Sequence, residues 1–156
     1  MQSVKIVEAD LDRPEHQAAV VELVDAFALQ STGKPLSFDA RRALVPGLRE
    51  YPTTMIFLAF LGEKAIGIAV CFRGFSTFAA RPLINIHDLV VLPEHRGGGV
   101  GRLLLEAVEA KARELGCCKL TLEVNEKNEG ARRLYKTAGF SGAAGGGSLF
   151  LSKTLP

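Results

Sequence analysis

Apolar residues along this chain recur with the two periods that predict secondary structure, every second residue for strands and every three to four residues for helices. The strands predicted from alternation cover residues 4–7, 53–61, 65–72, 83–92 and 119–124. The predicted helices cover residues 14–30, 38–49 and 100–115, with a last helix after Asn128 that ends at Gly139. Phe140 and residues 148–153 offer two closing strands around the glycine-rich segment 143–147. The predicted order is therefore β-α-α-β-β-β-α-β-α-β-β.

One strand–helix–strand unit stands at the centre of this order, formed by residues 83–92, 100–115 and 119–124. Such a unit makes its two strands parallel and connects them by a right-handed crossover. The fold class expected is thus α/β with a mixed sheet and helices on its faces. Because the chain contains a single unit of this kind, a doubly wound nucleotide-binding fold is disfavoured. A length of 156 residues suits one domain over residues 1–156.

Several local signals refine these elements. Pro46 lies inside the helix expected over residues 38–49 and should kink or break it. Asn128 suits the N-cap of the last helix, where its side chain can accept from a backbone N–H. Residues 75–82 are expected to form a loop with exposed aromatic side chains, and His16 is expected to be solvated on its helix.

The most apolar strand, residues 83–92, is interrupted by one polar pair, His87 and Asp88. A polar pair in a buried strand costs free energy unless it is hydrogen-bonded or functional. Strand alternation places the two side chains on opposite faces unless a β-bulge intervenes. We therefore expect only one of them to face a functional cleft.

Composition excludes several classes of protein. The net charge is only +2 and no long basic block occurs, which disfavours a nucleic-acid binder. No apolar run reaches the length of a membrane span and the first residues lack a signal peptide, so we expect a cytoplasmic protein that binds no membrane. Cys71, Cys117 and Cys118 indicate neither a disulfide framework nor a metal site. Apolar edges such as residues 149–151 favour a homodimer.

The chemistry suggested by the sequence centres on residues 97–101, which contain four glycines between a buried strand and a long helix. Small residues allow backbone N–H groups to approach a ligand, and the helix dipole favours an anion there. Arg96 and Arg102 flank the run and add positive charge. The pattern predicts a cradle for a phosphate or diphosphate.

Two known glycine-loop patterns do not fit. A P-loop requires Gly-Lys-Ser/Thr, but Gly101 is followed by Arg102 and Leu103. The dinucleotide pattern Gly-x-Gly-x-x-Gly requires a third glycine where this chain has Arg102 or Leu104.

A third pattern fits. Arg96-x-x-Gly99-x-Gly101, preceded by an apolar strand and followed by a long helix, resembles the acetyl-coenzyme A diphosphate loop of the GNAT superfamily of N-acyltransferases. A second segment resembles that superfamily's other cofactor segment in order and spacing, with Asn125-x-x-Asn128, Ala131, Tyr135 and Gly139-Phe140.

Within the superfamily, Phe75-Ser76-Thr77-Phe78 followed by Ile86-His87-Asp88-Leu89-Val90-Val91 resembles the diamine and thialysine acetyltransferase branch. The sequence departs from that branch at His87, where the branch carries a glutamate that anchors the acceptor amine.

The resemblance implies an N-acetyltransferase that moves an acetyl group from acetyl-CoA to a primary amine of a small molecule by direct attack. It also implies a set of residues in contact with acetyl-CoA: Leu89, Val90, Val91, Arg96, Gly97, Gly98, Gly99, Val100, Gly101, Arg102, Asn128, Ala131 and Tyr135. The alternatives are a protein or peptide N-acetyltransferase and a non-catalytic sensor that binds CoA.

Three residues are candidates for proton transfer. Tyr135 is the expected general acid, because a phenol with a reference pKa of about 10 stays protonated at neutral pH; the alternative is a core aromatic residue. His87 is the candidate general base, with a reference pKa of about 6.5, and a structural histidine is the alternative. Asp88 is an alternative base or substrate anchor. We expect the acceptor pocket to be built from the first two helices, their turn and the following aromatic loop, with Phe27, Gln30, Ser31, Phe38, Phe75, Phe78 and His87.

Overall fold

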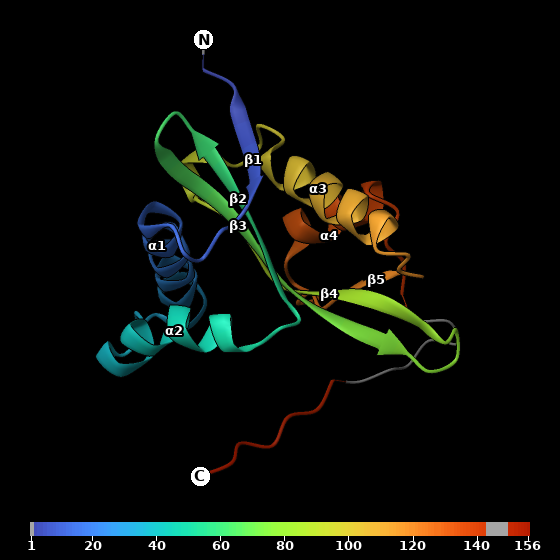
Figure 1. Ribbon diagram of the computed structural model, residues 1–156. Helices are drawn as coiled ribbons and strands as arrows, with labels where there is room; N and C mark the ends of the chain where they lie inside the picture. The colour runs from blue at the N-terminus through green and yellow to red at the C-terminus, as the bar shows by residue number, and fades with distance from the viewer. Residues whose placement is uncertain (1, 143–149) are drawn as a thin grey trace. The chain divides into compact units, whose positions relative to one another are not determined.

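The structure is a computed structural model that describes residues 2–142 and 150–156. It divides into two compact units, Met1–Glu123 and Val124–Pro156. The larger unit contains β1 (Val4–Glu8), α1 (Pro14–Thr32), α2 (Phe38–Glu50), β2 (Thr54–Leu61), β3 (Lys64–Ser76), β4 (Arg81–Val91), α3 (Val100–Glu114) and β5 (Leu120–Leu122) (Figure 1). The smaller unit contains α4 (Glu129–Thr137). That residues 1–156 form one domain stays a prediction.

The larger unit is built on a five-stranded sheet in the order β1-β2-β3-β4-β5. The first four strands pair antiparallel in sequence order. β4 and β5 pair parallel over Ile84–Ile86 and Leu120–Leu122, and α3 is the crossover between them. The α/β class with one parallel strand–helix–strand unit is therefore confirmed.

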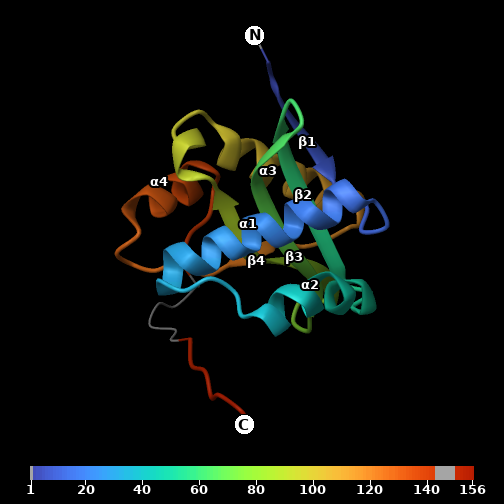
Figure 2. The ribbon, with the colours of Figure 1, turned by 90° about the vertical axis from the view of Figure 1, so that its left-hand side faces the viewer.

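Helices α1 and α2 cover one face of this sheet (Figure 2), and their apolar side chains fill the core there. The core cluster joins both helices to three strands and contains Ala19, Val20, Leu23, Val45, Ile56, Leu58, Ile68, Val70 and Val90. Helix α3 packs on the opposite face. A Cβ placed on Gly67 of β3 would lie 3.1 Å from the Val90 carbonyl oxygen and 3.2 Å from a methyl carbon of Leu104. A side chain at this position would therefore push the Leu104 side chain of α3 and the β4 backbone outward by a few tenths of an ångström.

Helix α2 runs through Pro46 to Glu50, so Pro46 does not break the helix, and the kink expected as the other outcome stays a prediction. A proline in a helix removes one N–H and leaves the carbonyl four residues earlier without its helical partner. Here Pro46 and Arg42 are both exposed, and water can hydrate the Arg42 carbonyl.

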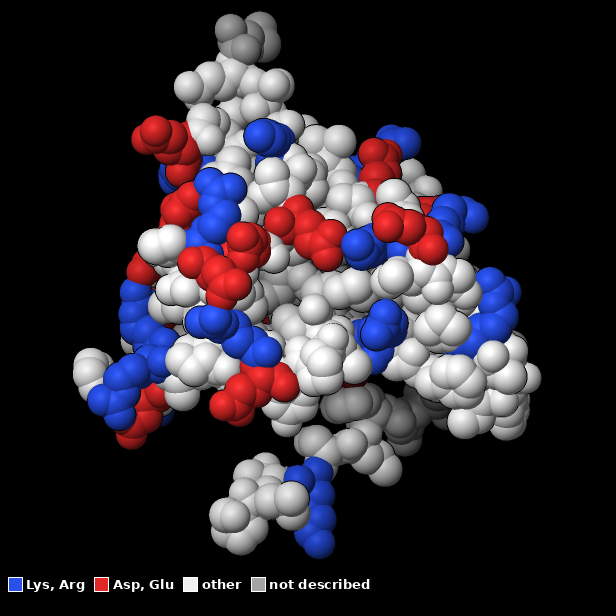
Figure 3. Space-filling model, viewed as in Figure 1, with Lys and Arg blue, Asp and Glu red and all other residues white. Residues whose placement is uncertain are grey.

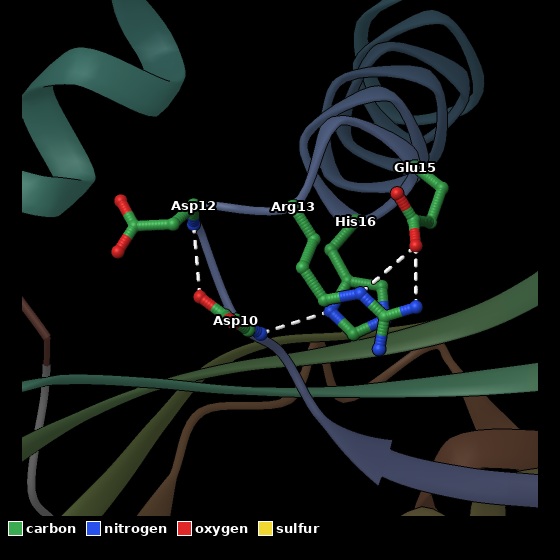
Figure 4. A network of polar contacts seen from close by, with 5 residues as sticks. All are labelled: Asp10, Asp12, Arg13, Glu15 and His16. Atoms are coloured by element: carbon green, nitrogen blue, oxygen red, sulfur yellow. Dashed lines mark hydrogen bonds and ion pairs between the residues drawn. The ribbon is translucent and has the colours of Figure 1, made fainter.

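His16 is buried, with 7% of its surface exposed, and the prediction that it is solvated is wrong. Its Nδ1 accepts a hydrogen bond of 2.9 Å from the Asp10 backbone N–H, as Figure 4 shows. Its ring lies 5.9 Å from that of Phe60. His16 shares one face of α1 with Val20 and Leu23. That face packs on the sheet, so the His16 imidazole is buried with them.

Two predicted segments differ in the structure. β3 extends to Ser76 and β4 begins at Arg81, so Phe75 lies in a strand and the loop is restricted to residues 77–80. Phe140 and residues 150–153 lie outside any strand, and residues 143–149 lie outside the described residues. Alternation of apolar and polar residues in a short segment predicts a strand only weakly, because the backbone groups of a strand also need a neighbouring strand with which to hydrogen-bond.

Candidate functional site

The glycine run forms the connection between β4 and α3. After one 3₁₀ turn over Pro93–His95, the chain reaches Gly97 and Gly99, whose φ angles are +79° and +88°. These left-handed conformations favour glycine. A Cβ added at either position would meet no atom within 4 Å. The backbone conformation rather than crowding therefore requires these glycines, and the space beside the loop is open.

The backbone donors of this loop are free to bind a ligand. Within the described residues, no acceptor is hydrogen-bonded to the N–H groups of Gly97, Gly98 or Gly99. The N–H groups of the first helical turn also lack acceptors inside the helix. Gly99 is the N-cap of α3 and has no side chain that could satisfy them.

Helix α3 also lacks the acidic residue that would compensate its dipole. Glu15, Asp39 and Glu129 stand in the first turns of α1, α2 and α4, whereas the first turn of α3 contains no acidic residue. The positive end of the α3 dipole is left without a negative partner from this turn. An anion such as a diphosphate fits this set of donors. The loop could therefore hold coenzyme A by its diphosphate group.

The two arginines beside the loop differ in their contacts. Arg96 donates from Nε to the Val91 carbonyl oxygen at 2.9 Å and from Nη2 to Oε1 of Gln30 at 2.7 Å. It thus connects the glycine loop to the end of α1, and it brings a predicted cofactor residue against a predicted acceptor residue. Arg102 is exposed and pairs with Glu106 one turn later in α3, at 3.1 Å.

β4 offers a free backbone edge just before the loop. β5 pairs with β4 only over Ile84–Ile86, so within the described residues no strand follows β4 along residues 88–91 on that side. The Val90 side chain is buried in the core, whereas Leu89 and Val91 are half-buried. The Leu92 N–H donates to the Ile66 carbonyl oxygen, so in this register the backbone groups of Val90 point to Ile68 of β3, and those of Leu89 and Val91 point to the free edge.

A β-bulge stands in the middle of β4. Val70 of β3 pairs with Asp88 and the next residue, Cys71, pairs with Ile86, which leaves His87 as the extra residue. Paired residues share a face of the sheet, so Asp88 lies on the face of Val70, which is the face covered by α1 and α2. The His87 ring packs edge-on against Phe72 on the same face, with ring centroids 5.7 Å apart. Because of the bulge, His87 and Asp88 lie on the same face of the sheet although they are adjacent in sequence.

The environment changes the acid–base properties of two groups in this unit. Burial raises the pKa of the half-buried Asp88 carboxyl, and the neighbouring His87 partly opposes that shift. Burial, together with the charge of Asp88, raises the pKa of the Cys71 thiol to about 12. Cys71 is therefore a neutral core residue, because nucleophilic cysteines react as thiolates.

A cavity of about 630 Å³ opens beside the bulge. Six of its lining residues come from α2 and the residue after it: Ala40, Ala43, Leu44, Gly47, Leu48 and Tyr51. Thr53, Phe72 and His87 complete the wall. His87 is the one predicted acceptor residue that lines this cavity. The apolar spacing of Ala40, Leu44 and Leu48 was the available signal, but the same spacing is typical of a core-facing helix.

The other predicted acceptor residues lie elsewhere in the larger unit. Phe27 packs against the core cluster, and Gln30 and Ser31 are exposed at the end of α1. The remaining aromatic residues are exposed by 75% for Phe38, 63% for Phe75 and 105% for Phe78. Phe38 also lies under the guanidinium of Arg42, at 5.5 Å.

The smaller unit holds the other predicted cofactor residues. Asn128 accepts a hydrogen bond from the Ala131 N–H at 3.1 Å, which confirms it as the N-cap of α4. Tyr135 is half-buried and stacks edge-on against Phe140 at 5.8 Å. Burial raises the pKa of the Tyr135 phenol above its usual value of 10, so the hydroxyl keeps its proton at neutral pH.

Charged and metal-ligating side chains form no further site in the described part of the chain. On the face shown in Figure 3, acidic and basic side chains are interspersed. Among residues 2–142 and 150–156, no group of three or more His, Cys, Asp or Glu side chains could hold a metal ion. No helix in these ranges has the length and apolar character that crossing a membrane requires.

Comparison with known proteins gives this arrangement a family. The model of the Acetyltransferase (GNAT) family matches residues 21–140, which include the glycine loop, the bulge and α4. A thialysine N-epsilon-acetyltransferase of Bos taurus is 35% identical over 78 residues, or 50% of this chain and 45% of that protein. An N-alpha-acetyltransferase MAK3 of Arabidopsis thaliana is 33% identical over 125 residues, or 80% of this chain and 60% of that protein. The chain thus spans about half the length of these curated relatives.

Solved structures share the fold. An aminoglycoside N-acetyltransferase AAC(6')-Iy, solved in complex with CoA, superimposes with a TM-score of 0.78 at 19% identity, covering 99% of this chain and 97% of that one. The family model, which spans most of the chain and includes both cofactor segments predicted from the sequence, shows that this protein belongs to the GNAT acetyltransferase family.

Proposed function

We propose that this protein is an acetyl-CoA-dependent N-acetyltransferase that acts on a primary amine of a small molecule. The observation that carries the proposal is the loop at the start of α3. Its N–H groups are unpaired in the described residues, its two left-handed glycines open the space beside it, and its helix dipole lacks an acidic partner in the first turn. A diphosphate is the ligand that this donor set suits.

In this proposal the N–H groups of residues 97–102 bind the diphosphate of coenzyme A. Arg96 orders the loop through its bonds to Val91 and Gln30, and the edge of β4 offers the backbone groups of Leu89 and the Val91 N–H to the pantetheine. Acetyl-CoA supplies an acetyl group activated as a thioester. The chain's own residues then have to place the amine and move its proton.

His87 is the proposed group that accepts the proton of the acceptor ammonium, and Asp88 is the alternative base. The bulge brings both residues to one face, and His87 lines the cavity that we assign to the acceptor. The raised pKa of Asp88 makes its carboxylate a stronger base than an exposed one. Tyr135 is the proposed general acid, because its phenol retains a proton to donate to the leaving thiolate.

A protein or peptide N-acetyltransferase is the second candidate. The similarity to the plant N-alpha-acetyltransferase supports it, because that match extends over 80% of this chain. The two candidates differ in whether free amines or peptide N-termini are acetylated.

A homodimer is also proposed, supported by the exposure of Phe150 and Leu151 at 74% and 83%. Sedimentation velocity tests it, and a monomer at all concentrations would remove it.

One experiment tests the main proposal in two steps. Acetyl-CoA at about 100 times its Kd should stabilise the fold by about 2.7 kcal/mol and raise the melting temperature by about 5–10 °C, whereas NAD and ATP should leave it unchanged. Thiol release from acetyl-CoA is then followed with diamines, amino acids, alkylamines, aminoglycosides and peptides. Stabilisation without thiol release on any amine would identify a CoA sensor, and the absence of both would overturn the proposal.

A further inference from the structure

The cavity beside the bulge carries information about the acceptor amine that the glycine loop does not. Its wall is formed by alanine, leucine and glycine positions of α2 together with the Phe72 ring. Its polar groups are few: the His87 imidazole, the Tyr51 hydroxyl and the Thr53 side chain. A volume of about 630 Å³ is typical of small-molecule sites, which bury most of their ligand.

We propose that the acceptor is a primary amine carried on one apolar group, such as an arylalkyl or alkyl chain, and that it bears no second positive charge. The inference rests on the proposed function, whose acceptor site it describes. The apolar group contacts the leucine side chains of α2 and the Phe72 ring, and the amine lies toward His87, the titratable group at the bulge.

Among the described residues, no carboxylate lines this cavity, so a second ammonium group in the bound amine would have no ionic partner in the lining. A diamine or an aminoglycoside would place its second charge beside leucine and alanine side chains, which offer it no hydrogen bond. The arginines of α2 pair with other residues: Arg41 with Glu22 and Asp25, Arg42 with Asp39, and Arg49 with Asp12. Glu50, the last residue of α2, is exposed and does not line the cavity. Asp88 is close in sequence but does not line the cavity, and burial already disfavours its charged form.

The position of His87 supports the orientation of the amine. His87 is the extra residue of the bulge, and its ring packs edge-on against Phe72 at 5.7 Å. The apolar wall and the titratable group are therefore neighbours in one cavity. An amine whose apolar group rests on Phe72 brings its nitrogen toward the imidazole.

The test compares two amines of equal length, pentylamine and cadaverine, which differ by a second terminal amine. We expect kcat/KM for pentylamine to exceed that for cadaverine by about 100-fold or more, because only cadaverine places an unpaired charge in the apolar cavity. Phenethylamine should also be a good acceptor. A value for cadaverine equal to or above that for pentylamine would overturn the inference, while the proposed function would stand because acetyl transfer is observed.

A matched pair of variants tests the cavity itself. Ala43→Glu places a carboxylate on the lining at an exposed helical position, and Ala110→Glu makes the same change at an exposed position of α3 outside the lining. Glutamate is a good helix former, so both variants should fold. Ala43→Glu should lower the pentylamine-to-cadaverine ratio at least about 10-fold by pairing the second ammonium, and Ala110→Glu should leave the ratio unchanged. Equal ratios in the two variants would contradict the assignment of the cavity.

A second readout does not depend on turnover. If no amine is acetylated, the proposed function fails, and the binding of the amines then decides the specificity of the cavity. Pentylamine must raise the melting temperature of the wild-type protein more than cadaverine does, and Ala43→Glu must reduce that difference. Equal or reversed shifts would overturn the inference by themselves.

Discussion

The glycine loop can be tested by adding a single methyl group, with a second glycine of the same helix as the control. Gly99, the N-cap of α3, has a φ of +88°, and Gly116, beyond the other end of α3, has a φ of +72°. A Cβ added at either position would meet no atom within 4 Å. Gly99→Ala and Gly116→Ala therefore share the cause of their strain, a left-handed backbone conformation, and differ only in which end of α3 they affect. Each should destabilise the fold by about 1–2 kcal/mol, the cost of a left-handed conformation for a residue with a side chain.

The two variants should differ in ligand binding. In Gly99→Ala, the free loop can relieve the strain by leaving the conformation that holds its N–H groups together, and a bound diphosphate has to restore it. The stability lost by the free protein and the binding free energy lost then add up to the strain of about 1–2 kcal/mol, so the Kd for acetyl-CoA rises by up to about 5- to 30-fold. Gly116→Ala should keep the wild-type Kd, because its strain lies away from the loop.

Calorimetric titration with acetyl-CoA measures both Kd values, and urea unfolding measures both stabilities. If Gly99→Ala loses less stability than Gly116→Ala does and still binds acetyl-CoA as tightly, the loop has changed its conformation without an effect on binding, and the conformation has no part in it. The proposed diphosphate site would then be wrong, whatever the activity of the enzyme.

Three further changes test other parts of the structure. Gly67→Ala should lower the free energy of unfolding in urea by about 1–3 kcal/mol through overpacking against α3, whereas Gly74→Ala on the same strand meets its nearest atom at 3.4 Å and should be nearly neutral; equal effects would contradict the packing argument. Tyr135→Phe should lower kcat about 100-fold or more while acetyl-CoA still raises the melting temperature, and an unchanged kcat would exclude the phenol from the mechanism. For Asp88 the folded pKa lies above the unfolded value of about 3.9, so the native state binds more protons between the two values and stability falls as pH rises through that window. Asp88→Asn should therefore raise the melting temperature at about pH 7 and lose that gain at a pH below the unfolded value, and a gain independent of pH would refute the shift.

The sequence predicted the features that depend on local signals. The glycine run 97–101 identified its loop because left-handed backbone and free N–H donors depend on a few adjacent residues. Asn128 identified the start of α4 in the same way, since an N-cap is formed within one turn. The parallel pairing of β4 with β5 followed from the one strand–helix–strand unit of the chain, as right-handed crossovers leave little choice.

The features that the sequence did not predict depend on contacts between distant segments. Apolar spacing along α2 does not distinguish a helix face that fills a core from one that lines a cavity, and Leu44 and Leu48 do both. A polar side chain on a predicted helix indicates solvent exposure for His16, yet its Nδ1 accepts from the Asp10 N–H in the preceding loop. The bulge at His87 depends on the register of β3 against β4, and neither strand specifies it alone.

That one extra residue decides which layer of the protein each half of β4 belongs to. Before the bulge, Ile84 pairs with Arg73 and Ile86 pairs with Cys71. Arg73 and Cys71 lie on the same face of β3 as Gly67, and that face packs against α3. After it, Val90 joins the core under α1 and α2. The apolar residues at the even positions Ile84, Ile86 and Val90 thus serve both sides of the sheet, with the change of side at His87 and Asp88. Straightening the bulge while keeping His87 would slip one half of β4 by one residue against β3 and turn its apolar side chains to the other face. The residue proposed to accept a proton therefore also absorbs the one-residue offset between the two hydrophobic cores.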